Sequence, residues 1–186
     1  MGESLAGMKP YRVEYVQLIG WENDLVGLWL AENDEWLLLR HVPIDYVVDG
    51  YLLIAKQHIA TRDSKKKQKQ VEQILKLKGI KAEVPPRFVF GDVVDMFRWV
   101  EQHFGIAEFA DEEESVFLGW LDRADAVHFW INSLDPDGTV TPSDEDEQPF
   151  VLSELRYISF DTDYINSMKL LWQHKSRQVL LKPSDN

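Results

Sequence analysis

The stretch of sequence that decides the fold is VGLWLAENDEWLLLRHV, residues 26–42. Two apolar segments flank the polar residues Glu32, Asn33 and Asp34, and this arrangement predicts a β-hairpin. We expect its strands over residues 25–31 and 35–42. Pro43 ends the second strand, because proline cannot donate a hydrogen bond to a sheet.

The segments on either side extend the β pattern. After Asp49-Gly50, which predicts a turn, residues 51–56 are expected to form a third strand. Residues 11–19 alternate loosely and are rich in Val and Tyr, which favours a strand, with a short amphipathic helix as the alternative. Ser64 can cap a helix whose apolar residues then recur at helical spacing through QVEQILKLKG, residues 70–79.

The same order of features recurs about ninety residues later. LGWLDRADAVHFWINSL, residues 118–134, predicts a second hairpin, and a turn at Asp137-Gly138, a strand and the helical pattern DYINSMKLLW follow it. This recurrence predicts an internal duplication. In the two copies we expect matching core positions for Leu38 with Phe129 and for Ile59 with Ile158.

Between the copies, Pro85-Pro86 interrupts regular structure. A helix is predicted to begin at Asp92 and to end at Gly105, with an entering strand over residues 106–109 and a last strand over residues 178–181. The expected domains are an N-terminal small β-barrel with its following helix (1–83), a connecting helix and strand (84–110) and a C-terminal small β-barrel with a terminal helix (111–186).

Composition limits the class of protein. With 186 residues, 45% hydrophobic residues and seven Trp, the chain has ample core material. No apolar run approaches the roughly 20 residues of a membrane helix, and no secretory signal is recognised at the N-terminus, so a cytoplasmic protein without a membrane span is expected. The absence of cysteine excludes disulfides, thiolate catalysis and Cys-ligated metals.

Charge is distributed unevenly along the chain, whose net charge is −12. Residues 92–163 hold nineteen Asp or Glu against three Arg, whereas residues 64–81 carry seven Lys and one Glu. Such charge runs are usually solvated faces, but they are also the candidate contact surfaces for a partner. The candidate interaction residues are Lys65, Lys66, Lys67, Lys69, Asp144, Glu145, Asp146 and Glu147.

The familiar catalytic and cofactor motifs are missing from the sequence. There is no G-x-S-x-G, no glycine-rich phosphate loop and no zinc spacing among the five His, so neither an enzyme nor a cofactor is expected. Asp135-Pro136-Asp137-Gly138 fits a turn better than a calcium loop, since the further ligands are missing. Whether Arg40 and His41, at a strand end, line a ligand site stays open.

The segments YVVDGYLLIAKQHI (46–59), DVVDMFRWVEQHFG (92–105), VFLGWL (116–121) and FVLSELRYISFDTDYINSMKLL (150–171) carry a resemblance. The chain resembles an uncharacterised bacterial family built from two tandem Sm-like or SH3-like small β-barrels. The resemblance implies a mainly β, α+β fold with a duplicated small antiparallel barrel, and it brings no established activity. The strands LLIAKQ and FVLSEL lack the Arg-Gly pair of the Sm-like nucleotide pocket.

Three functions follow as hypotheses. The leading one is a non-catalytic protein-interaction module that self-associates through strand edges, which offer unpaired backbone groups. The second is an acidic inhibitor, of the immunity type, that binds a basic partner. The third is a weak Sm-like RNA binder, which is the least favoured because carboxylates repel the phosphate backbone. The expected partner is thus a protein or a second copy, and neither nucleic acid nor membrane.

Overall fold

The computed structural model describes residues 11–63, 66–113, 115–144 and 148–181. The fold is mainly β with three α-helices, α1 (Lys66–Leu77), α2 (Val93–Phe104) and α3 (Asp163–Leu181). All strand pairs between named strands are antiparallel, which confirms the predicted α+β class. Within the described ranges, no helix is both long and apolar enough to cross a lipid bilayer.

Each half of the chain supplies one run of strands. The first run is β1 (Val13–Leu18), β2 (Asp24–Glu32), β3 (Trp36–His41), β4 (Tyr51–Ala55) and β5 (Ile59–Asp63), with the 3-10 helix η1 (Lys56–His58) before β5. The second run is β6 (Ala107–Glu112), β7 (Ser115–Ala124), β8 (His128–Leu134), β9 (Val140–Thr141), β10 (Phe150–Val151) and β11 (Tyr157–Phe160), with the 3-10 helix η2 (Leu152–Glu154) before β11. The predicted hairpins are therefore confirmed.

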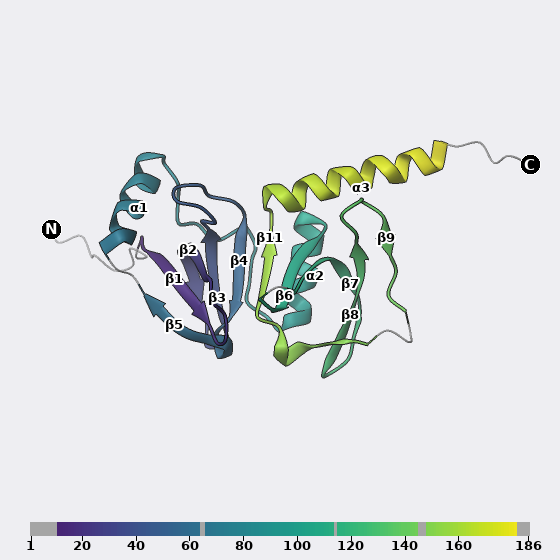
Figure 1. Cartoon of the computed structure of the whole chain (residues 1–186), viewed down its shortest axis with the longest axis horizontal. Helices are drawn as coiled ribbons and strands as arrows, with labels where there is room; N and C mark the ends of the chain where they lie inside the picture. The colour runs from purple at the N-terminus through teal and green to yellow at the C-terminus, as the bar shows by residue number, and fades with distance from the viewer. Residues whose placement is uncertain (1–10, 64–65, 114, 145–147, 182–186) are drawn as a thin grey trace, which may run out of the picture.

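The strands join into one sheet rather than two closed barrels. Their order is β10-β8-β7-β6-β11-β4-β3-β2-β1-β5, with β9 paired to the other end of β8. In the first half, β4 pairs with β11 of the second half, while β5 pairs with β1. The expected closure of each half is therefore not observed, because the pairing that continues the sheet from β4 leads into the other half (Figure 1).

The two central hairpins have the same register. Gly27 of β2 lies opposite His41, and Gly119 of β7 lies opposite Ser133. A Cβ on Gly27 would lie 2.6 Å from Leu39 Cβ, and a Cβ on Gly119 would lie 2.1 Å from a backbone oxygen of β8. Glycine therefore permits the close approach of the neighbouring strand in both hairpins.

Aligned on these glycines, the halves match differently from the sequence-based prediction. Leu37, not Leu38, corresponds to Phe129, and Arg62, not Ile59, corresponds to Ile158. A shift of one residue places a side chain on the other face of a sheet. The run of three consecutive leucines has no alternation that could reveal which of them faces the core of its own half.

The central strands are buried on both faces. Leu37 and Leu39 belong to a cluster with Val16, whereas Leu38 and Leu53 belong to a second cluster with residues of the other half. This second cluster contains Phe97 and Phe109, whose ring centres are 5.6 Å apart, together with residues of α2 and β8. The core thus continues from one half into the other.

Helix α2 lies as predicted from its sequence. Asp92 caps it by accepting a hydrogen bond from Asp95 N at 2.8 Å, and Gly105, at φ 94°, ends it. Its apolar residues Met96, Phe97 and Val100 are buried in the shared core. These residues pack α2 against β6, β7 and β11 of the second half of the sheet.

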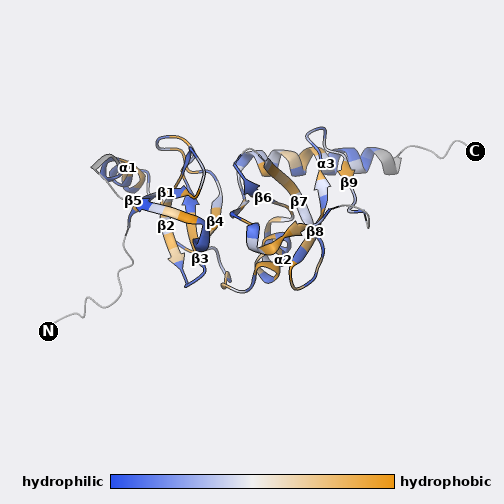
Figure 2. Cartoon of the chain, turned by 60° about the horizontal axis from the view of Figure 1, so that its bottom comes forward, coloured by the Kyte–Doolittle hydropathy of each residue, from blue (hydrophilic) through white to orange (hydrophobic). Residues whose placement is uncertain are grey.

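Helix α3 corrects one prediction. Residues 178–181 belong to this helix and not to a last strand. Thr162 Oγ1 accepts a hydrogen bond from Ile165 N, and Asp49 Oδ1 accepts one from Asp163 N, so both halves hold the start of α3. Lys, Arg, Gln and Leu, which favour helices, then carry it past the body of the sheet (Figure 1). Figure 2 shows hydrophobic and hydrophilic residues along both α2 and α3.

Candidate functional site

A cavity of about 630 Å³ lies where the two halves meet. The first half contributes the β2–β3 turn with Asp34 and Glu35, the first residue of β3, Trp36, and the end of β4 with η1. The second half contributes Val93, at the start of α2, and residues of η2. Pockets of about 300–1,000 Å³ accommodate small molecules or a few amino-acid side chains, so this cavity is large enough to bind a ligand.

The floor of the cavity is apolar and its rim is charged. Trp36 is 4% exposed, and Leu155 and Ala55 beside it are also buried. Asp34 and Glu35 are exposed on the rim. Lys56 also lines the cavity, but its Nζ donates a hydrogen bond to the Asn33 carbonyl oxygen at 2.8 Å.

Hydrogen bonds join η1 to the second half beside the cavity. Gln57 Nε2 donates to Ser153 O at 3.0 Å, and His58 Nε2 lies 2.9 Å from the same oxygen. Arg156 Nη1 lies 2.7 Å from His58 Nδ1, and Arg156 Nε donates to Asp111 O. This set is satisfied when His58 is neutral, with its proton on Nε2. Burial and the positive charge of Arg156 lower the pKa of His58.

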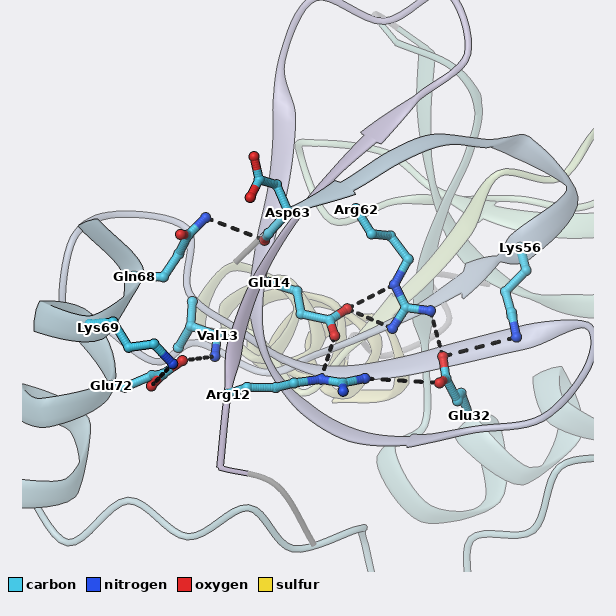
Figure 3. Close-up of polar contacts among 10 residues, drawn as sticks. All are labelled: Arg12, Val13, Glu14, Glu32, Lys56, Arg62, Asp63, Gln68, Lys69 and Glu72. Atoms are coloured by element: carbon cyan, nitrogen blue, oxygen red, sulfur yellow. Dashed lines mark hydrogen bonds and ion pairs between the residues drawn. The ribbon is translucent and has the colours of Figure 1, made fainter. Parts of the chain in front are cut away.

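A second polar group lies beside the end strand β5 (Figure 3). The Glu14 carboxylate, 6% exposed, accepts hydrogen bonds from Arg62 Nε at 2.9 Å and Arg62 Nη2 at 2.7 Å. Arg12 Nε lies 2.6 Å from Glu14 but makes no hydrogen bond, so that contact is ionic. Arg62 Nη1 also donates to Glu32 at 2.6 Å. These residues neutralise one another, which indicates that the group fastens β5 to the sheet.

The lysines singled out from the sequence are only partly described. Lys66, Lys67 and Lys69 lie in α1, and Lys65 lies outside the described residues. Lys69 Nζ lies 3.4 Å from Glu72 Oε2, whose other oxygen accepts a hydrogen bond from Val13 N. The buried Glu72 therefore joins α1 to β1, and the exposed Lys69 pairs with it within the helix.

The strand β9, which Asp144 follows closely in sequence, lies at the other end of the molecule from α1 (Figure 1). Asp144 is exposed, and its backbone oxygen accepts a hydrogen bond from Arg123 Nη2 at 3.2 Å. Glu145, Asp146 and Glu147 lie outside the described residues. Among the candidates that the structure describes, Asp144 therefore lies apart from Lys66, Lys67 and Lys69 within one chain.

Arg40 and His41 do not line the cavity. The Arg40 guanidinium stacks over the Tyr51 ring, 4.2 Å from its centre. His41 Nδ1 is buried without a hydrogen-bond partner, and burial lowers the pKa of His41, while Asp49 acts in the opposite direction. In the described parts of the chain, no three His, Asp or Glu side chains are grouped to hold a metal ion.

Sequence reasoning missed the cavity. Its walls come from residues 34–36, 55–57, 93, 152–153 and 155, which no local motif connects. The signal that could have indicated it is the pair of short segments, Lys56–His58 and Leu152–Glu154, each of which directly precedes the last strand of its half.

Comparison with known proteins leaves the chain without an assigned family. No family model, no curated protein and no solved structure matches it.

Proposed function

We propose that this chain is a non-catalytic protein-interaction module that associates with further copies of itself through the two ends of its sheet. We also propose that its halves are diverged copies of one small Sm-like or SH3-like barrel. The shared order of four strands, a 3-10 helix and a last strand supports this duplication, if the two-residue strand β9 is counted as an addition. The common register at Gly27 and Gly119 supports it as well.

The observation that carries the proposal is the way the halves are joined. The fourth strand of the first half, β4, pairs with the last strand of the second half, β11, through Leu53 opposite Ile158 and three further residue pairs. The corresponding strands are β10 in the second half and β5 in the first half, and these are the two end strands of the sheet. A second copy could therefore repeat the internal junction, with β10 of one copy against β5 of the next.

The register of such a contact follows from the internal one. In β10, Phe150 lies opposite Phe129, as Ile54 of β4 lies opposite Leu37. In β5, Thr61 lies opposite Gln17, as Tyr157 of β11 lies opposite Ala110. Since Ile54 and Tyr157 face each other at the junction, and Ala55 N donates to Arg156 O, Phe150 of one copy is expected opposite Thr61 of the next and Val151 opposite Ala60.

The charges at the two ends favour the same head-to-tail orientation. The lysine-rich helix α1 follows β5 directly, and the acidic sequence at 144–147 precedes β10. Opposite charges thus lie close in sequence to the two strands that would pair. Such a heterologous contact closes into a ring or continues as a filament.

The test is a pair of charge changes at the two end strands. Ala60 is exposed, Val151 is partly buried, and the two are expected to lie opposite each other across the contact. We expect a concentration-dependent oligomer for the unaltered chain in sedimentation velocity, and a shift towards monomer for the double variant Ala60→Lys with Val151→Lys, since like charges would face each other. Ala60→Glu combined with Val151→Lys should restore association.

Matched lysines outside the end strands serve as the control. Val116→Lys and Val127→Lys replace exposed valines and should leave the oligomer unchanged. A chain that is monomeric at all concentrations well above micromolar would contradict the proposal. So would an oligomer that the double lysine variant of the end strands does not affect.

A further inference from the structure

The cavity between the halves is a site of a different kind from the ends of the sheet, and it does not depend on self-association. Its walls come from both runs of strands and from the start of α2, so it exists only when the halves are docked. Gln57 Nε2 and His58 Nε2 contact Ser153 O beside it, at 3.0 and 2.9 Å. The cavity is therefore formed before any ligand arrives, which lowers the entropic cost of binding.

The floor selects for an apolar group. Trp36, Ala55 and Leu155 are buried in its walls, and Val93 and Leu152 are partly exposed within it. Side chains already fixed by packing lose little freedom when a ligand covers them. A ligand that carries only charges would leave this apolar surface uncovered.

The rim selects for positive charge. Within the described residues, no partner engages the carboxylates of Asp34 and Glu35, whereas Lys56 is turned towards Asn33 O and the Glu32 carboxylate, 4.0 Å away. The ammonium of Lys56 is thus compensated, and the two free carboxylates set the sign of the rim. An approaching phosphate would be repelled, and an approaching ammonium or guanidinium would be attracted.

We propose that this cavity binds a short extended segment of a partner protein, in which an apolar side chain stands next to lysine or arginine. The apolar side chain enters the floor between Trp36, Val93 and Leu152. The neighbouring cation lies against Asp34 and Glu35. The charge of the rim and the apolar floor together distinguish this ligand from a nucleic acid and from an acidic peptide.

The probe is the peptide Ac-Gly-Lys-Leu-Arg-Gly-amide, titrated into the full ¹⁵N-labelled chain and followed by NMR. We expect saturable shifts of the Trp36 indole N–H and of the Gln57 and Val93 amides, with a Kd of about 1 mM or tighter. The indole of Trp172, which stacks on Trp120 in another part of the chain, is the internal reference and should not move. Ac-Gly-Glu-Leu-Glu-Gly-amide and Ac-Gly-Lys-Ser-Arg-Gly-amide should bind at least about tenfold more weakly, since each lacks one of the two features.

The variants separate charge from fold. Asp34→Asn with Glu35→Gln should raise the Kd for the Lys-Leu-Arg peptide at least about fivefold. The control variant, Asp45→Asn with Glu112→Gln, changes two exposed carboxylates outside the cavity and should leave this Kd unchanged. Both double variants change exposed side chains and should unfold at the same temperature as the unaltered chain. Equal binding of the acidic peptide, unchanged binding by the Asp34 and Glu35 variant, or shifts that avoid Trp36 would each overturn the proposal.

Discussion

The Glu14 side chain is largely buried, and replacing it should destabilise the protein more than replacing an exposed carboxylate that also pairs with arginine. In Glu14→Gln the side chain keeps its shape but loses its charge, so the Arg62 hydrogen bonds weaken and Arg12 loses its closer ionic partner, keeping only Glu32 at 3.9 Å. Because the Glu14 side chain is 6% exposed, water cannot replace these contacts.

The magnitude follows from the exposure of the partners. Removing one member of a fully buried ion pair costs about 3–5 kcal/mol. The side chains of Arg12 and Arg62 are 36% and 25% exposed to solvent, and Arg62 still pairs with Glu32 in the variant. The cost should therefore lie at the lower end of this range or below it. We expect a loss of about 2 kcal/mol for Glu14→Gln and about 3 kcal/mol for Glu14→Ala. For a chain of this length, 2 kcal/mol lowers the Tm by about 4–8 °C.

The assay is equilibrium unfolding in urea, monitored by tryptophan fluorescence. An m-value equal to that of the unaltered chain would show that the substitution has not changed the unfolded state. Glu32→Gln is the matched control, because Glu32 contacts the same Arg62 but is 29% exposed, and its loss should cost only about 0.5–1 kcal/mol. The reasoning fails if Glu14→Gln costs less than about 0.5 kcal/mol, or if Glu32→Gln costs more than Glu14→Gln.

Four further predictions test other parts of the argument. Since the pKa of His58 is lowered in the folded state, the free energy of unfolding should fall as pH drops below about 6.5. The lowered pKa of His41 acts in the same direction. The contribution of His58 is therefore measured as the difference in unfolding free energy between pH 7.5 and pH 5 that His58→Gln removes in denaturation curves. Gly119→Ala should cost about 3 kcal/mol or more in urea unfolding, because the new Cβ would lie 2.1 Å from Asn132 O, whereas Gly79→Ala, with open space around it, should cost about 1 kcal/mol for its positive φ alone. Filter binding at physiological salt should detect no appreciable RNA or DNA binding; submicromolar affinity with a steep salt slope would instead favour the nucleic-acid hypothesis. Light scattering should show a smaller oligomer at high salt, because part of the proposed contact is ionic, and an unchanged mass would leave only the strand-edge contribution.

Local patterns in the sequence predicted the elements well and their assembly poorly. The β2–β3 hairpin and α2 carry their own turn, cap and apolar spacing, so their positions follow from neighbouring residues. The pairing of β4 with β11 depends on residues about a hundred positions apart, and no local pattern specifies it. Closed barrels were therefore expected where one continuous sheet is formed.

The candidate site shows the same division between local and long-range information. Charge runs are visible in any sequence, and they led to the lysines of α1 and to Asp144. Figure 1 shows α1 and β9, the strand before Asp144, at opposite ends of the molecule. The cavity instead requires the docked halves, since Trp36 and Leu152 are brought together only by the junction. In the leucine run at 37–39, consecutive apolar residues are buried on both faces, which hides the phase of the strand.

The long-range pairing of β4 also bears on how the chain is made. When β4 leaves the ribosome its partner β11 has not been synthesised, and about a hundred residues separate Ala55 from Tyr157. At about 5–20 residues per second, β4 waits roughly 5–20 s for that partner. Throughout this interval the edge of β4 is unpaired, and the apolar face that carries Leu38 and Leu53 lacks its cover. The nascent first half is thus the stage of synthesis most exposed to aggregation and most dependent on chaperones.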